Sequence, residues 1–277
     1  MMAHNSTLTV HQALYGNEEK SSSSPKNLSK WTLEADSDKL RCALGEAFAG
    51  TDTVGGEPIL DWGFGHCSFK PEERVQLFQF MMAYPLYEDI QKPSFQICSE
   101  NGNGDIKSLA SVVEYDNDRN NSKKPFKKIR EGWANLVTTM RLLLVHKEKV
   151  PDLFKSPDRK ADLKRMEQKL GKNFQEKCDQ WHFEHGPKGK HWFVHMVGVV
   201  PDHQGQGMGK ELMAKLNDMA DKMNQAMYLE AGERNRRFYE KMGFVVQHTV
   251  TLEDPDDAEN SFLVHLMTRE PHHETCS

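Results

Sequence analysis

A glycine-rich turn that joins an apolar strand to an amphipathic helix is the sequence feature that most restricts the possible folds. Residues 192–200 are almost continuously apolar, as expected for a strand buried on both faces. Gly205, Gly207 and Gly209 follow, and residues 205–223 have the apolar periodicity of a helix. Glycines let a ligand approach the backbone closely, and a helix N-terminus carries a partial positive charge. We therefore expect a cradle for an anion, best matched to a diphosphate; a glycine turn that only packs is the alternative.

Two common phosphate-binding motifs do not fit this turn. A P-loop requires Ser or Thr after its Gly-Lys pair, whereas Gly209-Lys210 is followed by Glu211. The dinucleotide-binding fingerprint is a closer rival, because Glu230 lies 21 residues beyond Gly209 at the end of the next predicted strand. That fingerprint requires a glycine at position 210, however, and lysine stands there. Both nucleotide-binding classes are therefore excluded.

The same turn resembles the motif of GNAT acetyltransferases, Gln/Arg-x-x-Gly-x-Gly/Ala, which reads Gln-Gly-Gln-Gly-Met-Gly at residues 204–209. The run Asn-Arg-Arg-Phe-Tyr-Glu-Lys-Met-Gly-Phe at residues 235–244 is similar to puromycin N-acetyltransferase and its relatives. The resemblance covers residues 191–246 and extends in layout to 30–116. It implies an α/β fold with a mixed, mostly antiparallel central sheet flanked by helices. The fourth and fifth strands would splay apart. The helical insertion that we expect between the third and fourth strands departs from the family's fold.

This resemblance implies acetyl-CoA as co-substrate and acetyl transfer to a primary amine. The main chain of Val197, Gly198 and Val199 would bond the pantetheine arm and the acetyl carbonyl. Asn235 matches a position that contacts CoA, and Tyr239 matches the general acid that protonates the departing thiolate. Tyrosine, with an ordinary pKa near ~10, keeps its proton at neutral pH. The residues implied for the diphosphate are Gln204, Gly205, Gln206, Gly207, Met208, Gly209 and Lys210.

The general base is the least determined part of the expected site. Relatives that use a carboxylate on the fourth strand would place it near Phe193, which cannot act as a base. His191 and His195 flank Phe193 at two residues' distance, so strand alternation puts all three on one face. A histidine there titrates in the right range, or it is bonded within the sheet. Glu230 on the next strand is a further candidate, with a structural salt bridge as its alternative role.

The chain is expected to form one domain over residues 30–277, after a polar segment, 1–29, that is disordered or loosely attached. Residues 119–190 carry 19 Lys and Arg against 9 Asp and Glu, a net charge of +10, whereas the whole chain has −5. The remainder is therefore at −15. Because the family joins these strands briefly, we expect a basic helical insertion over 117–186. A solvated helix face is favoured over a nucleic-acid patch for its lysines.

The periodicity and turn residues also predict the N-terminal elements. Residues 31–35 are expected to form a first strand, followed by helices from residue 37 to residue 50 and from Pro71 onwards. Two β-rich runs at 94–98 and 106–115 flank an Asn-Gly-Asn-Gly turn, which is typical of a hairpin.

The cysteines and apolar segments limit the cellular locations and the metal sites that the sequence is compatible with. Five cysteines, an odd number and far apart in the chain, indicate a reducing, cytoplasmic setting. No apolar run reaches the ~18 residues of a membrane span. Cys178, His182 and His185 would share one face of a helix, as metal ligands do. No fourth ligand has a matching spacing, so an ordinary helix whose histidines face the acceptor is favoured and no metal is expected.

Three functions are compatible with the sequence. The favoured one is an acetyl-CoA-dependent N-acetyltransferase that modifies a primary amine of a small molecule. A protein lysine or N-terminal acetyltransferase is the second, with the insertion shaping a peptide groove. The third is a catalytically silent CoA-binding interaction module, against which the intact Tyr239 and glycine turn argue.

Overall fold

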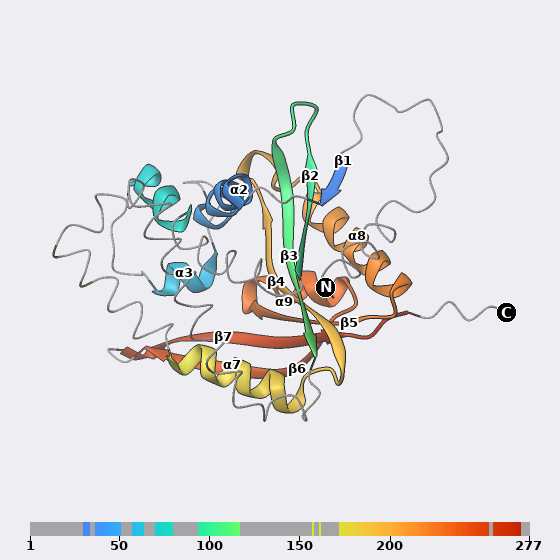
Figure 1. Cartoon of the computed structure of the whole chain (residues 1–277). Helices are drawn as coiled ribbons and strands as arrows, with labels where there is room; N and C mark the ends of the chain where they lie inside the picture. The colour runs from blue at the N-terminus through green and yellow to red at the C-terminus, as the bar shows by residue number, and fades with distance from the viewer. Residues whose placement is uncertain are drawn as a thin grey trace, which may run out of the picture.

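Seven strands form one sheet, in the order β1-β2-β3-β4-β5-β7-β6 (Figure 1). The computed structural model describes residues 30–33, 37–50, 57–63, 70–79, 94–116, 157, 161, 172–254 and 257–272. Neighbouring strands are antiparallel except β4 and β5, which are parallel. The mixed, mostly antiparallel sheet expected from the sequence is therefore confirmed. The strands are β1 (Lys30–Leu33), β2 (Ser94–Glu100), β3 (Ile106–Asp116), β4 (Lys190–Val199), β5 (Ala226–Gly232), β6 (Val245–Asp254) and β7 (Asp257–Arg269).

The N-terminal elements lie close to their predicted positions. The first helix, α2, spans Ser37–Ala49, and the helix predicted at Pro71 covers residues 71–79. Strands β2 and β3 form the expected hairpin. In its turn, the Asn101 side chain accepts the backbone N–H groups of Asn103 and Asp105, each at 2.9 Å. Side-chain bonds of this kind are the reason that asparagine favours turns.

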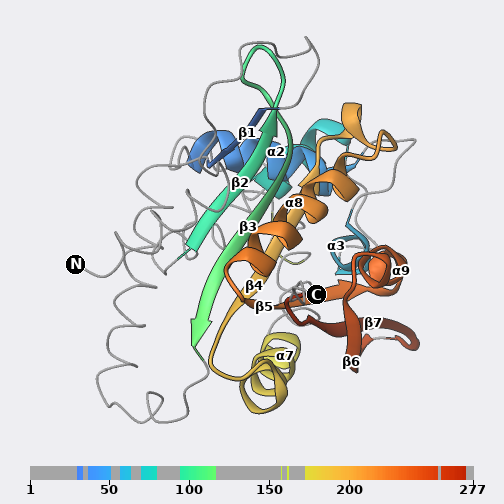
Figure 2. The same ribbon diagram turned by 90° about the vertical axis from the view of Figure 1, so that its right-hand side faces the viewer.

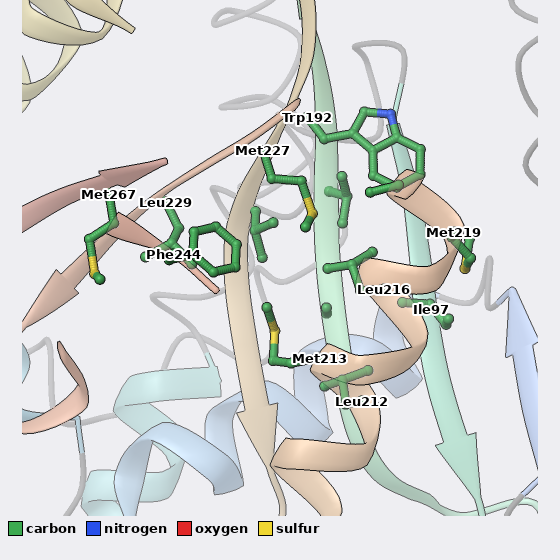
Figure 3. Packing of buried hydrophobic residues seen from close by; sticks show 14 of the residues in the cluster. Ile97, Trp192, Leu212, Met213, Leu216, Met219, Met227, Leu229, Phe244 and Met267 are labelled. Carbon is green, nitrogen blue, oxygen red and sulfur yellow. The ribbon is translucent and has the colours of Figure 1, made fainter. Parts of the chain in front are cut away.

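Helices α2 and α8 (Met208–Lys222) pack on opposite faces of strands β2, β3 and β4 (Figure 2). Neighbouring residues of β2 show this, because Ile97 packs with α8 and Cys98 packs with α2. The α8 side holds the larger core, in which Leu212, Met213 and Leu216 are fully buried (Figure 3). Burying each such side chain stabilises the fold by about 1.5–3 kcal/mol. This core fixes the glycine turn, since the turn leads directly into α8.

Helix α8 begins three residues later than the periodicity predicted. Gly205 and Gly207 have φ angles of +72° and +85°, in the left-handed region that a right-handed helix cannot use. The apolar stripe predicted from the sequence begins at Met208, which is also the first helical residue. The two glycines therefore belong to the turn.

Strands β4 and β5 pair over only three positions before they separate. The last pair is Phe193 with Tyr228. On the other side of β4, Val194 pairs with Val112 and Met196 with Ser111 of β3, which makes His195 the extra residue of a β-bulge. The bulge bends β4 at the point where β5 leaves it. The splayed fourth and fifth strands expected from the sequence are therefore present.

The remaining helices cover the second half of the sheet. Helix α7 (Lys172–His185) packs on β6, while α9 (Glu233–Lys241) contacts β5, β6 and β7. A short helix, α3 (Pro58–Gly63), contributes Trp62 to the cluster that α7 covers. Apart from α7, nearly all of the predicted insertion at 117–186, and all of the predicted N-terminal segment 1–29, lie outside the described residues. Within the described residues, no helix is both long enough and apolar enough to cross a bilayer.

Candidate active site

The glycine turn forms one wall of a cavity of about 540 Å³. The short helical turn Pro201–His203 leads from β4 into it, and the Gln204 side chain donates a hydrogen bond to the carbonyl of Val199 at 2.9 Å. This bond ties the start of the turn back to the end of β4. The lining residues expected to bind the cofactor are Val197, Gly198, Val199, Gln204, Gly205, Gly207, Met208, Gly209, Lys210 and Asn235.

Gln206 is the one expected cofactor residue that does not line this cavity. Its side chain is exposed and donates a hydrogen bond to the carbonyl of Asp202 at 2.8 Å. Sequence reasoning placed it at the cofactor because the motif names its position, but the two positive φ angles on either side of it turn its side chain outwards. Its side chain instead closes the turn on itself.

The cavity fits a diphosphate in both space and charge. A Cβ atom added to Gly205 or Gly207 would meet no atom within 4 Å, so both glycines face open space. Lys210 and Arg234 contribute two positive charges to the lining, against the one carboxyl of Glu57, and α8 directs its N-terminus at the same turn. The first N–H groups of a helix have no partner inside it and bind anions. The residues present are therefore suited to the diphosphate of a CoA thioester.

A second, inner cavity of about 290 Å³ lies where β4 and β5 separate. It shares Phe48, Glu57, Val197 and Asn235 with the outer cavity, so the two are continuous. His195, Glu230 and Tyr239, the three residues predicted to act in catalysis, all line this inner cavity. They come from β4, β5 and α9, and the separation of the strands brings them together.

Glu230 has the environment of a base that titrates near neutrality. Burial raises the pKa of its carboxyl to about 7, against the opposing effects of a hydrogen bond from Tyr228 and the nearby His195. The Tyr228 hydroxyl donates this bond to Oε1 at 2.9 Å. The alternative role for Glu230, a salt bridge within the fold, stays a prediction; the hydrogen bond that the structure shows for its carboxyl comes from a neutral hydroxyl. A carboxylate with this pKa accepts protons efficiently at neutral pH.

Tyr239 keeps its proton under all ordinary conditions. Burial, and then the negative charge of Glu57, raise the pKa of its hydroxyl. Its ring is held edge-on between Phe238 and Phe244, at centroid distances of 5.1 and 6.0 Å. A protonated, fixed hydroxyl in the wall of the inner cavity can donate a proton there.

Glu57 is a site residue that sequence reasoning missed. It precedes α3, lines both cavities, and has a pKa raised to about 7, mainly by burial. Its backbone N–H donates to the carbonyl of Phe48 at 2.9 Å, which ties the start of α3 to the end of α2. No motif surrounds it in the sequence. Its position depends on how α3 packs against the far strands, so no local signal could have identified it.

His191 does not line the inner cavity. It shares a strand face with Phe193 as predicted, but α7 covers that face, and the two Nε2 atoms of His191 and His182 are 2.7 Å apart. The Nδ1 atom of His191 lies 3.0 Å from the carbonyl oxygen of Gly189. Burial lowers the pKa of His182 to about 3 and also lowers that of His191, so both rings stay neutral. The predicted alternative, a histidine bonded within the fold, therefore holds for His191.

The three residues with metal-ligand spacing do not converge. Cys178 is buried, and burial raises the pKa of its thiol. His182 contacts His191, whereas His185 is exposed beside Glu184. In the part of the chain that the structure describes, no three His, Cys, Asp or Glu side chains are grouped as metal ligands.

The sheet, its separated strands and the glycine turn together define the class of protein: the chain has the α/β GNAT fold. Residues 174–246 match the family described as Acetyltransferase (GNAT) domain, which supports a place in the GNAT acetyltransferase superfamily.

Two solved structures illustrate the likeness. Arylalkylamine N-acetyltransferase 2 from Aedes aegypti is 17% identical, with 89% of this chain and 100% of that chain covered and a TM-score of 0.48. A protein of Corynebacterium glutamicum described as histone acetyltransferase HPA2 and related acetyltransferase is 16% identical, with 90% and 99% covered and a TM-score of 0.46.

Proposed function

We propose that this chain is an N-acetyltransferase that moves the acetyl group of acetyl-CoA to a primary amine of a small molecule. The observation that carries this proposal is the junction of the two cavities. The basic outer cavity with its glycine turn meets an inner cavity that holds a carboxyl of pKa about 7 and a protonated tyrosine. The similarity of residues 235–244 to puromycin N-acetyltransferase supports a small-molecule acceptor.

Residues that line the two cavities have distinct roles in this reaction. Glu230 takes the proton of the acceptor's ammonium group, which leaves a neutral amine able to attack. The amine nitrogen bonds to the acetyl carbon, and the bond from that carbon to sulfur breaks. Tyr239 gives its hydroxyl proton to the departing thiolate. The nitrogen, which is positively charged after its attack, releases its second proton to solvent as the amide forms, and Tyr239 regains a proton from solvent. The main chain near Val199, at the end of β4, stabilises the oxyanion, and the charge of His195 helps to keep Glu230 ionised.

Replacing Tyr239 by Phe tests the catalytic part of the proposal. Thiol release from acetyl-CoA is followed with a panel of small amines, a lysine peptide and a free N-terminal peptide. We expect turnover with a small amine, and a fall in kcat of ~10²–10⁴-fold in Y239F with little change in the dissociation constant of acetyl-CoA. Greater activity on a peptide would point to a protein acetyltransferase. Acetyl-CoA binding without any turnover would point to a silent module.

A further inference from the structure

The two connected cavities differ in charge. The described lining of the outer one contains the cations Lys210 and Arg234 and one carboxyl, Glu57. The described lining of the inner one contains two carboxyls, Glu57 and Glu230, with His195 beside Glu230, and neither lysine nor arginine. An anion is therefore favoured in the outer cavity and a cation in the inner one, because like charges repel strongly in a partly desolvated site. Of the two carboxyls, Glu57 lies at the boundary, since it lines both cavities.

The walls of the inner cavity are predominantly apolar. Rings from four different segments contribute, and the ring of Phe262 packs 6.0 Å from Trp62 while that of Phe193 packs 5.2 Å from Tyr228. These neighbours hold the rings in place, so the wall is preformed. Burying apolar surface against it is favourable, whereas a hydroxyl-rich body would lose its bonds to water. Apolar lining residues include Phe48, Ile59, Phe193, Met196, Val197 and Phe262.

We propose that the inner cavity selects an acceptor amine with an apolar, ring-bearing body and no carboxylate or phosphate, and that Glu57 imposes this selection. The inference rests on the proposed function and names its substrate class. Glu230 is occupied with the proton of the reacting nitrogen, and Glu57 supplies the second negative charge. An α-carboxylate on the acceptor would enter a small chamber that already holds two carboxyls. The amine is accepted and the corresponding amino acid is rejected.

The environment of Glu57 supports this role. Burial opposes the ionised form of Glu57, as does the negative charge of Asp61. A hydrogen bond from the backbone of Ile59 and the positive charge of Arg234 favour that form. Its pKa of about 7 leaves it ionised in about half of the molecules at neutral pH. A cationic acceptor shifts it further towards the carboxylate, and an anionic acceptor forces it to take up a proton. Binding of the acceptor is therefore coupled to the ionisation of Glu57.

The matched probes are 2-phenylethylamine and L-phenylalanine, which differ by one carboxylate, with glucosamine as an amine on a polar body. We expect the kcat/KM of phenylethylamine, measured by thiol release, to exceed those of phenylalanine and glucosamine by ~100-fold or more. In E57Q the ratio of phenylethylamine to phenylalanine should fall at least tenfold. Glu114 is a matched control, because burial also raises its pKa but it lines neither cavity. E114Q should keep the wild-type ratio.

The outcomes separate this inference from the proposed function. If calorimetry shows no binding of acetyl-CoA, the proposed function is refuted, and the inference that rests on it is refuted with it. If acetyl-CoA binds and is consumed, but phenylalanine or glucosamine is used as well as phenylethylamine, the selection is refuted. An unchanged ratio in E57Q refutes the role of Glu57 alone. If no probe is acetylated, the test is binding instead of turnover. The dissociation constants of phenylethylamine and phenylalanine are then measured with CoA present, and equal values overturn the inference.

Discussion

The hydroxyl of Tyr228 should set the pH at which the enzyme becomes active. It donates to Oε1 of Glu230 at 2.9 Å, and burial raises its own pKa, so it is always a donor. A donor stabilises the ionised form of the carboxyl and lowers its pKa. Of the other groups around Glu230, His195 also lowers its pKa and Asp179 of α7 raises it. Replacing Tyr228 by Phe removes one of the two effects that keep Glu230 ionised, while the ring stays in place.

The size of the effect follows from the strength of that bond. A hydrogen bond to a charged group contributes about 1.5–3 kcal/mol, and 1.36 kcal/mol corresponds to one pKa unit. Taking the lower figure, because Glu230 faces a cavity, its pKa should rise by ~1 unit from its value of about 7. At pH 7 the ionised fraction would fall from about one half to about one eleventh. We therefore expect kcat/KM at pH 7 to fall about fivefold, and most of this loss to be regained at pH 9.

The measurement is the pH profile of kcat/KM for wild type and Y228F with the same amine, so that the amine's own ionisation cancels. Tyr115 provides a matched control, because its ring belongs to the same aromatic cluster, 4.9 Å from the ring of His182, but lies on β3. Y115F should keep the wild-type profile. If Y228F loses activity equally at every pH, with the acidic limb unmoved, Tyr228 only packs and the reasoning about Glu230 is wrong.

Two further substitutions test the cradle and the cost of the buried carboxyl. Gly207→Val puts a branched side chain into open space at φ +85°, so acetyl-CoA should bind at least ~10-fold more weakly by calorimetry. Gly104→Val, at φ +81° in the distant β2–β3 hairpin, imposes the same strain and should leave binding unchanged. The folded-state pKa of Glu230 is raised, so the stability it contributes is present at low pH and lost as the pH rises through about 7. E230Q should therefore abolish turnover. At pH 8 it should raise the free energy of unfolding by up to ~3 kcal/mol, and with it Tm, whereas at pH 5 both gains should be much smaller. Equal shifts in Tm at both pH values would contradict the raised pKa.

The parts of the site that the sequence predicts are those built from neighbouring residues. The turn from Gln204 to Lys210 is one such part, because the glycines and the start of the helix are themselves the binding geometry. Tyr239 and Asn235 follow from a motif within α9 for the same reason. Their positions in the fold are determined by a few residues on either side, so a pattern in the chain is sufficient.

The parts that the sequence misses depend on distant packing. Strand alternation places His191, Phe193 and His195 on one face, and the rings of Phe193 and His195 do lie 5.0 Å apart, but α7 covers His191, whereas His195 lines the inner cavity. One extra residue in β4 changes the face that each later residue presents, and no periodicity shows it. Glu57 enters the site only because α3 packs against the region of β7, through contacts such as that of Trp62 with Phe262.

The topology of the sheet explains why Glu230, the proposed base, is buried and yet faces a cavity. Glu230 follows Tyr228 on β5 just beyond the last pair with β4, so its side of the strand faces the gap instead of a neighbour. On its other edge β5 continues to pair with β7, where Glu230 lies opposite Leu266, and this holds the backbone rigid. Tyr228 is fully buried, and the ring of His182 from α7 stacks on it at 3.9 Å. Helix α7, which lies outside the glycine turn, thus fixes the Tyr228 hydroxyl that bonds Glu230. A substitution in α7 should therefore alter the pH profile of catalysis, although α7 lines neither cavity in the described residues.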